Sequence, residues 1–211
     1  MELDGAPQIT AEEALETQAR LQAQARAKAQ TQQLHNVSFR QMDLEAMDFT
    51  KDQFDIATSS FGLFFIDDME TAMRHIAHTV KPGGKIAISG FMDTAFSPFS
   101  AMFLSLYEDF GKQAPPLSWQ RLASTAAIEK VYHAAGIRDV SFYQESLGYA
   151  LQSEQQWWDI VWNAGFRGLL NQLSEPEMAA FKTQHLKTID ELCRNGKNWL
   201  DISVMIAIGQ K

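Results

Sequence analysis

The chain has 211 residues, 45% hydrophobic and 21% charged, a composition that is typical of a globular protein and excludes a disordered one. Its 26 acidic side chains outnumber its 18 basic ones, and the net charge of −8 argues against sequence-independent nucleic-acid binding, which needs basic groups on the phosphates. The single cysteine, Cys193, excludes an intrachain disulfide framework and a cysteine zinc cluster, and makes the cytosol the simplest compartment.

Neither a membrane span nor a signal peptide is expected. No apolar run approaches the roughly 20 residues of a spanning helix. The first ten residues lack the basic and apolar regions of a leader sequence. We therefore expect a cytoplasmic protein that forms a single domain over residues 1–211.

The first half of the chain predicts a long helix and then alternating strands and helices. Residues 11–33 are nearly all strong helix formers. Residues 36–42 alternate apolar and polar side chains as a strand does, and 54–58 indicate a short buried strand. Residues 68–80 place their apolar side chains on one helical face, a Pro-Gly-Gly turn ends that helix, and 85–91 follow as a strand. Such a strand–helix–strand unit implies parallel pairing and an α/β fold.

The second half begins with an aromatic segment that prolines interrupt, at about 92–120, and it then becomes mainly helical. Ser174 and Glu177 have the spacing of a capping box at the start of one helix. The predicted helices are 98–110, 121–135, 153–165 and 174–194, and the predicted strands are 139–143 and a buried closing strand at 200–208.

Four segments together give the chain a family resemblance. They are NVSFRQMD, FTKDQFDIATSSFGLFFIDD, VKPGGKIAISGF, and HAAGIRDVSFYQ with the closing ISVMIAIGQK. In this order and at these spacings the chain resembles the class I S-adenosylmethionine-dependent methyltransferases, of the small-molecule type related to the ubiquinone/menaquinone C-methylases. The resemblance implies a Rossmann-like α/β sheet, mostly parallel with an antiparallel C-terminal strand. It also implies a substrate cover at about 92–120 and a helical region at about 150–198.

The resemblance also implies which residues bind the cofactor, S-adenosyl-L-methionine. Asp43, at the end of a predicted strand, would accept the adenine amino group, and Leu44 would offer its backbone N–H to the adenine ring. Ser59, Ser60 and Phe61 follow the next strand and would contact the methionine part.

The pattern offers two candidates for the carboxylate that binds the ribose hydroxyls. Counting back from Asp43 without a gap indicates Glu16, and Glu13 becomes the candidate if a short insertion is allowed. The residues before Glu16 favour helix over strand, however. In the alternative interpretation Glu12, Glu13 and Glu16 are surface charges in the first turns of a helix, where they suit its dipole.

The Gly-rich turn that follows the first strand of this family is missing. Among the fifteen residues before Glu16, Gly5 is the only glycine, and the first strand is therefore expected to be absent. Three explanations stay open at this point. The N-terminus is truncated or its start misassigned, or the chain is a degenerate relative that no longer binds cofactor, or another strand, from this chain or from a partner, closes the sheet.

Methyl transfer from a sulfonium needs mainly proximity and orientation, and aromatic rings could attract the cation or hold the acceptor. We expect an apolar or aromatic small-molecule acceptor, although each ring also suits core or lid packing. The candidate rings are Phe96, Phe99, Phe103, Tyr107, Trp119, Trp157, Trp158 and Trp162. No sequence partner argues for activation of His75, His78, His133 or His185, so no catalytic base and no metal site is predicted.

The leading hypothesis is S-adenosylmethionine-dependent methyl transfer to a small molecule. The alternative is a non-catalytic methyltransferase-like protein, or a truncated fragment, that acts as an interaction module. A nucleotide-binding oxidoreductase is a third hypothesis, and the missing glycines and the Lys-Pro-Gly-Gly segment disfavour it. An open sheet edge would favour self-association into a homo-oligomer.

Overall fold

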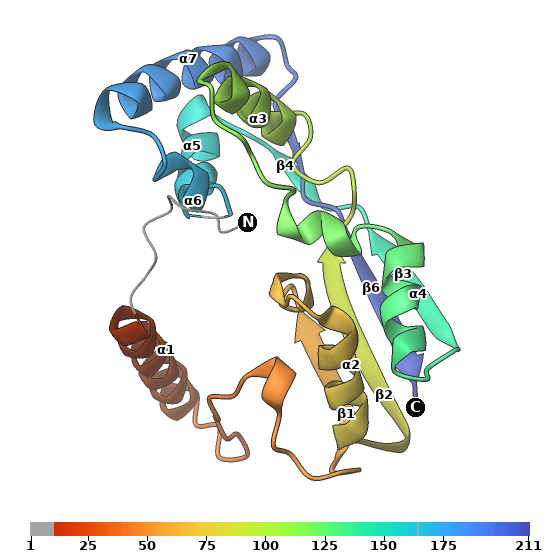
Figure 1. Ribbon diagram of the computed structural model, residues 1–211. Coiled ribbons are helices and arrows are strands. Elements are labelled where there is room, and N and C mark those ends of the chain that lie inside the picture. The colour runs from red at the N-terminus through yellow and green to blue at the C-terminus, as the bar shows by residue number, and fades with distance from the viewer. Residues whose placement is uncertain (1–10, 164) are drawn as a thin grey trace.

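The computed structural model describes residues 11–163 and 165–211, and Figure 1 shows three parts along the chain. A long N-terminal helix, α1 (Ala11–Thr31), stands to one side of a mixed β-sheet. Two helices cover one face of that sheet, and a separate group of helices lies beyond the carboxyl end of β2 (Val80–Phe91). This group is called the helical cap below.

The sheet has four strands among the described residues, in the order β1–β2–β6–β3. Besides β2, their bounds are β1 (Phe54–Ser60), β3 (Val140–Glu145) and β6 (Val204–Gln210). β1 pairs with β2 in parallel, and β6 runs antiparallel to both β2 and β3. Three strands therefore point the same way and only the C-terminal strand is reversed, which confirms the predicted mostly parallel sheet.

The predicted strand–helix–strand unit is confirmed by α2 (Met69–Thr79), which connects β1 to β2. Asp68 begins this helix, because its carboxylate accepts hydrogen bonds from the backbone N–H and the hydroxyl of Thr71 at 2.9 and 2.6 Å. Met73 and Ile76, on the buried face, belong to one core with residues of β2 and β6. The turn before 85–91 needs glycine at Gly83, where φ is +80°.

A second helix, α4 (Thr125–Ala134), packs on the same face and ties two strands together. The hydroxyl of Tyr132 lies 2.9 Å from the carbonyl oxygen of Ile86 in β2 and 2.8 Å from that of Ala207 in β6. Its ring lies so close to the sheet that a Cβ atom at Gly209 would be 2.7 Å away from it. α4 begins later than predicted because Ser124 caps it, accepting from the N–H of Ala127.

The prediction of a strand at 36–42 is wrong, because these residues have no regular secondary structure. No strand in the described residues pairs with their backbone. Instead the carbonyl of Phe39 accepts hydrogen bonds from the side chains of Gln22 and Arg26 on α1. Among the described residues β1 pairs only with β2, and Ile56 is 62% exposed, so the segment 54–58 is a strand but not a buried one.

The prediction of a helix from residue 11 is confirmed by α1, and it decides between the two interpretations of Glu16. Glu12, Glu13 and Glu16 all lie within the helix, in agreement with the helix-forming residues around them. The exposed side chain of Glu16 agrees with the alternative of a surface charge. These residues follow their helix propensity, because no strand in the described residues lies beside them to pair with their backbone.

The helical cap confirms three predicted helices and has its own aromatic core. Its helices are α3 (Phe99–Asp109), α5 (Glu154–Asn163), α6 (Arg167–Leu170) and α7 (Glu175–Arg194). The predicted capping box begins α7, where the Glu177 carboxylate accepts from the N–H and the hydroxyl of Ser174 at 2.7 and 2.8 Å. These bonds, the backbone one first, lower the pKa of Glu177 to about 2.

The predicted closing strand at 200–208 is divided in two. β5 (Trp199–Asp201) pairs with β4 (Gly148–Ala150) in a small antiparallel sheet, and β6 starts at Val204. The break follows from a turn in which the Asp201 carboxylate accepts from the N–H of Ser203 at 2.7 Å. No helix in the described part of the chain has both the length and the apolar character that crossing a membrane requires.

Candidate functional site

The chain turns sharply where β1 ends. Phe61 has a φ of +52°, which is uncommon for a residue other than glycine, and its N–H donates to the carbonyl of Ser89 in β2 at 3.1 Å. The short helix η2 (Leu63–Phe65) follows and buries Leu63 and Phe64. This turn places several phenylalanines over the carboxyl end of the parallel strands.

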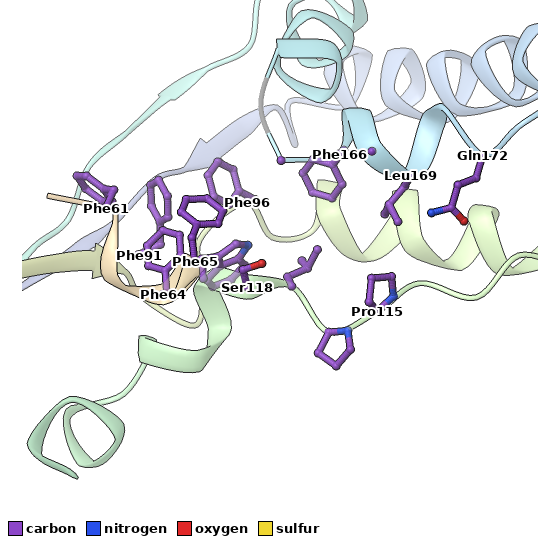
Figure 2. A pocket seen from close by; sticks show the side chains of 15 residues that line it. Phe61, Phe64, Phe65, Phe91, Phe96, Pro115, Ser118, Phe166, Leu169 and Gln172 are labelled. Carbon is purple, nitrogen blue, oxygen red and sulfur yellow. The ribbon is translucent and has the colours of Figure 1, made fainter. Parts of the chain in front are cut away.

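A cavity of about 700 Å³ lies between this turn and the helical cap, as Figure 2 shows. Its walls come from the segment after β1, the end of β2, the segment before α4, and α6 with its flanks. The lining residues are Phe61, Phe64, Phe65, Phe91, Phe96, Pro115, Pro116, Leu117, Ser118, Trp119, Gly165, Phe166, Gly168, Leu169 and Gln172. The volume suits a small organic ligand, and the lining is almost entirely apolar.

Aromatic rings cluster at the sheet end of the cavity. The ring of Phe91 lies 4.7 Å from that of Phe61 and 4.9 Å from that of Phe96, measured between centroids. Trp119 completes the cluster at 5.9 Å from Phe96 and 6.3 Å from Phe91. Such faces can hold an aromatic ligand or attract a cationic group.

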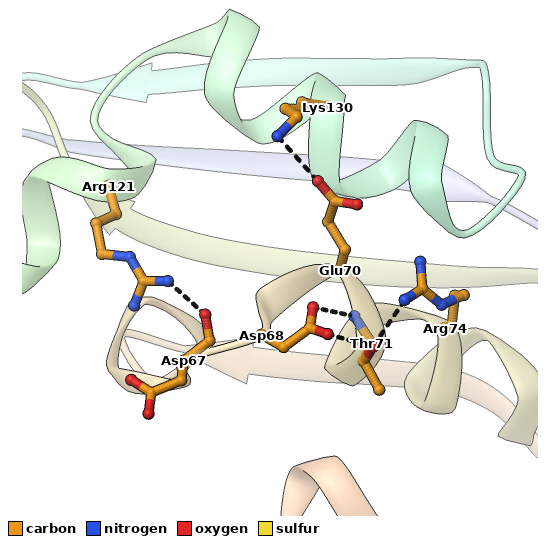
Figure 3. A network of polar contacts seen from close by, with 7 residues as sticks. All are labelled: Asp67, Asp68, Glu70, Thr71, Arg74, Arg121 and Lys130. Carbon is orange, nitrogen blue, oxygen red and sulfur yellow. Dashed lines mark hydrogen bonds and ion pairs between the residues drawn. The ribbon is translucent and has the colours of Figure 1, made fainter.

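Arg121 joins two walls of the cavity. It lies in η3 (Ser118–Leu122), the short helix that also carries Ser118 and Trp119 into the lining. Its guanidinium donates to the carbonyl oxygens of Phe64, Ile66 and Asp67 at 3.1, 2.7 and 2.8 Å. Figure 3 shows Arg121 reaching the backbone of Asp67. One side chain therefore fixes η2 against η3.

The other polar contacts in Figure 3 hold the helices on the sheet face together. Lys130 of α4 forms an ion pair with Glu70 of α2 at 3.0 Å, and Arg74 donates to the hydroxyl of Thr71 at 2.7 Å. The Thr71 hydrogen bonds are the main cause that lowers the pKa of Asp68. These residues support the α2–α4 layer and do not line the cavity.

Comparison with known proteins relates part of the chain to methyltransferases. A family model described as a methyltransferase domain matches residues 9–88, which include β1, α2 and most of β2. Over these residues the chain is similar to that methyltransferase domain family. A demethylmenaquinone methyltransferase of Streptomyces griseus is 32% identical over 114 residues, which cover 54% of this chain and 46% of that protein.

Other similarities are shorter or more distant. The ubiquinone/menaquinone biosynthesis C-methyltransferase UbiE of Shewanella frigidimarina is 40% identical over 58 residues, 28% of this chain and 23% of that protein. The crystal structure of YcgJ from Bacillus subtilis superposes with a TM-score of 0.58 at 18% identity and covers 91% of this chain and 78% of its own. That likeness shows the fold alone. The chain spans about half the length of the first relatives it matches.

One of the six residues predicted to bind the cofactor lines the cavity, namely Phe61. Ser59 and Ser60 precede it at the end of β1, and the hydroxyl of Ser60 accepts a hydrogen bond from that of Ser89 at 3.3 Å. These serines therefore stand at the sheet end of the cavity without lining it. Their contact with the methionine part stays a prediction.

The structure does not bring the other three predicted residues to the cavity. Asp43 is exposed and begins η1 (Leu44–Ala46), where its Oδ1 accepts from the N–H of Glu45 at 2.9 Å. Leu44 packs against the core of the sheet, and its carbonyl lies 3.3 Å from Nδ1 of His75 on α2. Glu16 lies on α1. The predicted strand end at Asp43 is thus a helix cap, because the strand itself does not form.

The predicted aromatic residues divide between the cavity and the core. Phe96 and Trp119 line the cavity, and Trp162 is 38% exposed. The remaining five are buried in the core of the helical cap, where packing is their role: Phe99, Phe103, Tyr107, Trp157 and Trp158. Sequence reasoning missed the wall around Phe166, Leu169 and Gln172, since no local motif marks it.

Proposed function

We propose that this protein transfers a methyl group from S-adenosylmethionine to an apolar or aromatic small molecule held in the cavity. The observation that carries the proposal is the position of the cavity. It opens at the carboxyl ends of β1 and β2, where open parallel sheets bind their ligands, and its lining is aromatic at that end. The similarity of residues 9–88 to a methyltransferase domain supports the reaction class.

The described residues fit the methionine end of the cofactor better than its adenosine end. Ser59, Ser60 and Phe61 would hold the methionine part beside the cavity, and the exposed Asp43 carboxylate would accept the adenine amine. Glu16 does not fit the ribose position as expected, since it lies on α1, whose contacts are with the loop at 39–41. When bound, S-adenosylmethionine supplies an electrophilic methyl group.

The side chains of the cavity act by positioning. Among the described lining residues none has a titratable side chain, so catalysis at this site would rest on proximity, orientation and exclusion of water. The acceptor atom would then either carry no proton or lose it without a protein base. The demethylmenaquinone in the name of the Streptomyces griseus relative is one acceptor to test.

A second candidate function has an observation of its own. Within the described residues the outer edge of β1 has no strand partner, and no glycine-rich turn follows a strand on that side. A non-catalytic methyltransferase-like module that associates through this edge would have the same features. The expected cytosolic location and homo-oligomer also remain predictions.

Calorimetric titration with S-adenosylhomocysteine, the cofactor product, distinguishes the two functions. Binding in the micromolar range supports the methyltransferase, and transfer of a radiolabelled methyl group to an apolar quinol would then establish the reaction. Absence of heat at high ligand concentration, with a folded protein by circular dichroism, contradicts the proposal and favours the module.

A further inference from the structure

The cavity has a polar group at the end that lies away from the sheet. Figure 2 shows Phe61 and Gln172 at opposite ends of the lining, with the apolar side chains between them. Gln172 follows α6, and its backbone N–H donates to the carbonyl of Leu169 at 3.1 Å, which fixes its position. Its carboxamide is therefore the one strong hydrogen-bonding side chain at that end of the described lining.

The orientation of this carboxamide is set by a buried tyrosine. The hydroxyl of Tyr107 on α3 donates to Oε1 of Gln172 at 3.2 Å. Tyr107 is 0% exposed, and burial, with the nearby charge of Glu177 as a smaller cause, raises the pKa of its hydroxyl. The hydroxyl therefore stays protonated at neutral pH and remains a donor. One lone pair of the carboxamide oxygen accepts from Tyr107, and among the described residues Nε2 has no side-chain or backbone acceptor.

Figure 2 also shows the nitrogen of Gln172 on the side that faces Leu169 and the rest of the lining. An amide N–H at the end of an apolar cavity favours a ligand that offers an oxygen to it. Gln172 is exposed in the free chain, where water can pair with these groups. A ligand that covers them without offering an oxygen would leave the donor desolvated and unpaired, which is unfavourable.

We propose that Gln172 is a specificity-determining residue, whose Nε2 donates a hydrogen bond to an acceptor oxygen at the trailing end of an elongated, otherwise apolar ligand. The leading end of that ligand lies against Phe61 and Phe91. The ligand class is thus a rod-shaped hydrocarbon or aromatic molecule with a terminal carbonyl, ether or phenolic oxygen. That this ligand is the methyl acceptor rests on the proposed function; the hydrogen bond itself does not.

Two probes with the same carbon skeleton test the hydrogen bond. The ketone 4-acetylbiphenyl carries a terminal carbonyl, and 4-ethylbiphenyl does not. Equilibrium dialysis against the full chain should show the ketone binding roughly 3- to 10-fold more tightly, as one hydrogen bond implies. The variant Gln172→Met, which has a similar volume and no donor, should bind the two equally and keep its affinity for 4-ethylbiphenyl.

Three further variants sharpen the result. Gln172→Glu keeps the shape but replaces the N–H groups by a carboxylate, so it should disfavour the ketone. Tyr107→Phe should reduce the preference, because it frees the carboxamide to rotate. Gln184→Met, at an exposed glutamine of α7 outside the lining, should leave the preference unchanged.

The proposal is overturned if the native chain binds both probes equally, if it binds neither, or if Gln172→Met keeps the preference while folded by circular dichroism. No cofactor is present in the dialysis. If the chain binds no S-adenosylhomocysteine yet prefers the ketone, the proposed methyl transfer is contradicted and the proposed role of Gln172 is supported.

Discussion

Trp157 donates its indole N–H to Nε2 of His185 at 2.7 Å in the interior of the helical cap. His185 is 1% exposed, and its ring lies 5.5 Å from that of Phe103 and 5.7 Å from that of Phe181, between centroids. Because Nε2 is the acceptor, the neutral imidazole carries its proton on Nδ1. Burial in these apolar surroundings lowers the pKa of His185 to about 4.

We predict from this pKa that the protein loses stability on acidification. The unfolded chain binds a proton at His185 near pH 6.5, whereas the folded chain resists protonation until about pH 4. The stabilising contribution is fully present above about pH 6.5 and is lost as the pH falls toward 4, by up to about 3 kcal/mol. Urea unfolding followed by circular dichroism across this range measures it.

The variant His185→Gln separates this effect from the titration of carboxylates. Glutamine can still accept the Trp157 N–H and does not titrate, so the variant should show a smaller loss of stability over the same pH range. His133→Gln, at an exposed histidine at the end of α4, is the matched control and should behave as the native chain. Equal pH dependence in all three proteins would contradict the prediction.

A second prediction concerns the contact between α4 and the sheet. Tyr132→Phe removes the hydroxyl that lies within hydrogen-bonding distance of the carbonyls of Ile86 and Ala207. Both carbonyls are in the interior, and the change should lower the free energy of unfolding by about 1–3 kcal/mol. Urea denaturation measures it, and Tyr143→Phe, at a tyrosine that is 53% exposed, should change it by less than about 0.5 kcal/mol. Similar losses in both variants would disprove the role of the buried hydroxyl.

The local sequence pattern predicted much of the sheet and its helices, because the burial of one face is visible within each element's own residues. The spacing of Met73 and Ile76 reflects burial on one face of α2, and that signal is contained within the helix itself. The strand at 36–42 could not be decided in the same way, since alternation describes side chains but a strand also needs a partner for its backbone. Here the carbonyl of Phe39 bonds to α1 side chains instead.

The candidate site was predictable only in part. The aromatic segment before α4 indicated a cover, and Trp119 does line the cavity. Gln172 could not be identified from the sequence, because its proposed role depends on Tyr107, 65 residues earlier in the chain. Asp43 was identified through the family pattern, but the loop geometry that places it as a helix cap depends on contacts with α2.

A third prediction tests the proposed adenosine contact at Asp43. Asp43→Ala should weaken S-adenosylhomocysteine binding by about 1–3 kcal/mol, the usual effect of removing a polar partner. Asp43→Asn keeps an oxygen to cap η1 but loses the carboxylate, so it should weaken binding with less change in stability. Calorimetry measures the affinity and urea denaturation the stability. Unchanged affinity in both variants of a chain that binds the ligand would refute the assignment.

A fourth prediction concerns Arg121, which should control the shape of the cavity without touching the ligand. Arg121→Met removes the donors to the carbonyls of Phe64, Ile66 and Asp67 while keeping much of the side-chain volume. Hydrogen bonds from a charged donor typically contribute about 1.5–3 kcal/mol each. The Arg121 side chain is exposed, so water can replace part of these bonds. We therefore expect the free energy of unfolding to fall by about 1–2 kcal/mol. The wall formed by η2 should then move relative to Trp119.

The consequence for binding distinguishes positioning from simple destabilisation. In Arg121→Met both biphenyl probes should bind several-fold more weakly, and their ratio should stay near the native value because Gln172 is untouched. Arg121→Lys retains the charge but can form fewer of the three bonds, and it should recover only part of the affinity. Arg138→Met, at an exposed arginine before β3, should bind as the native chain does. If Arg121→Met lost stability but bound both probes with native affinity, η2 would be held in place by the burial of Leu63 and Phe64 alone.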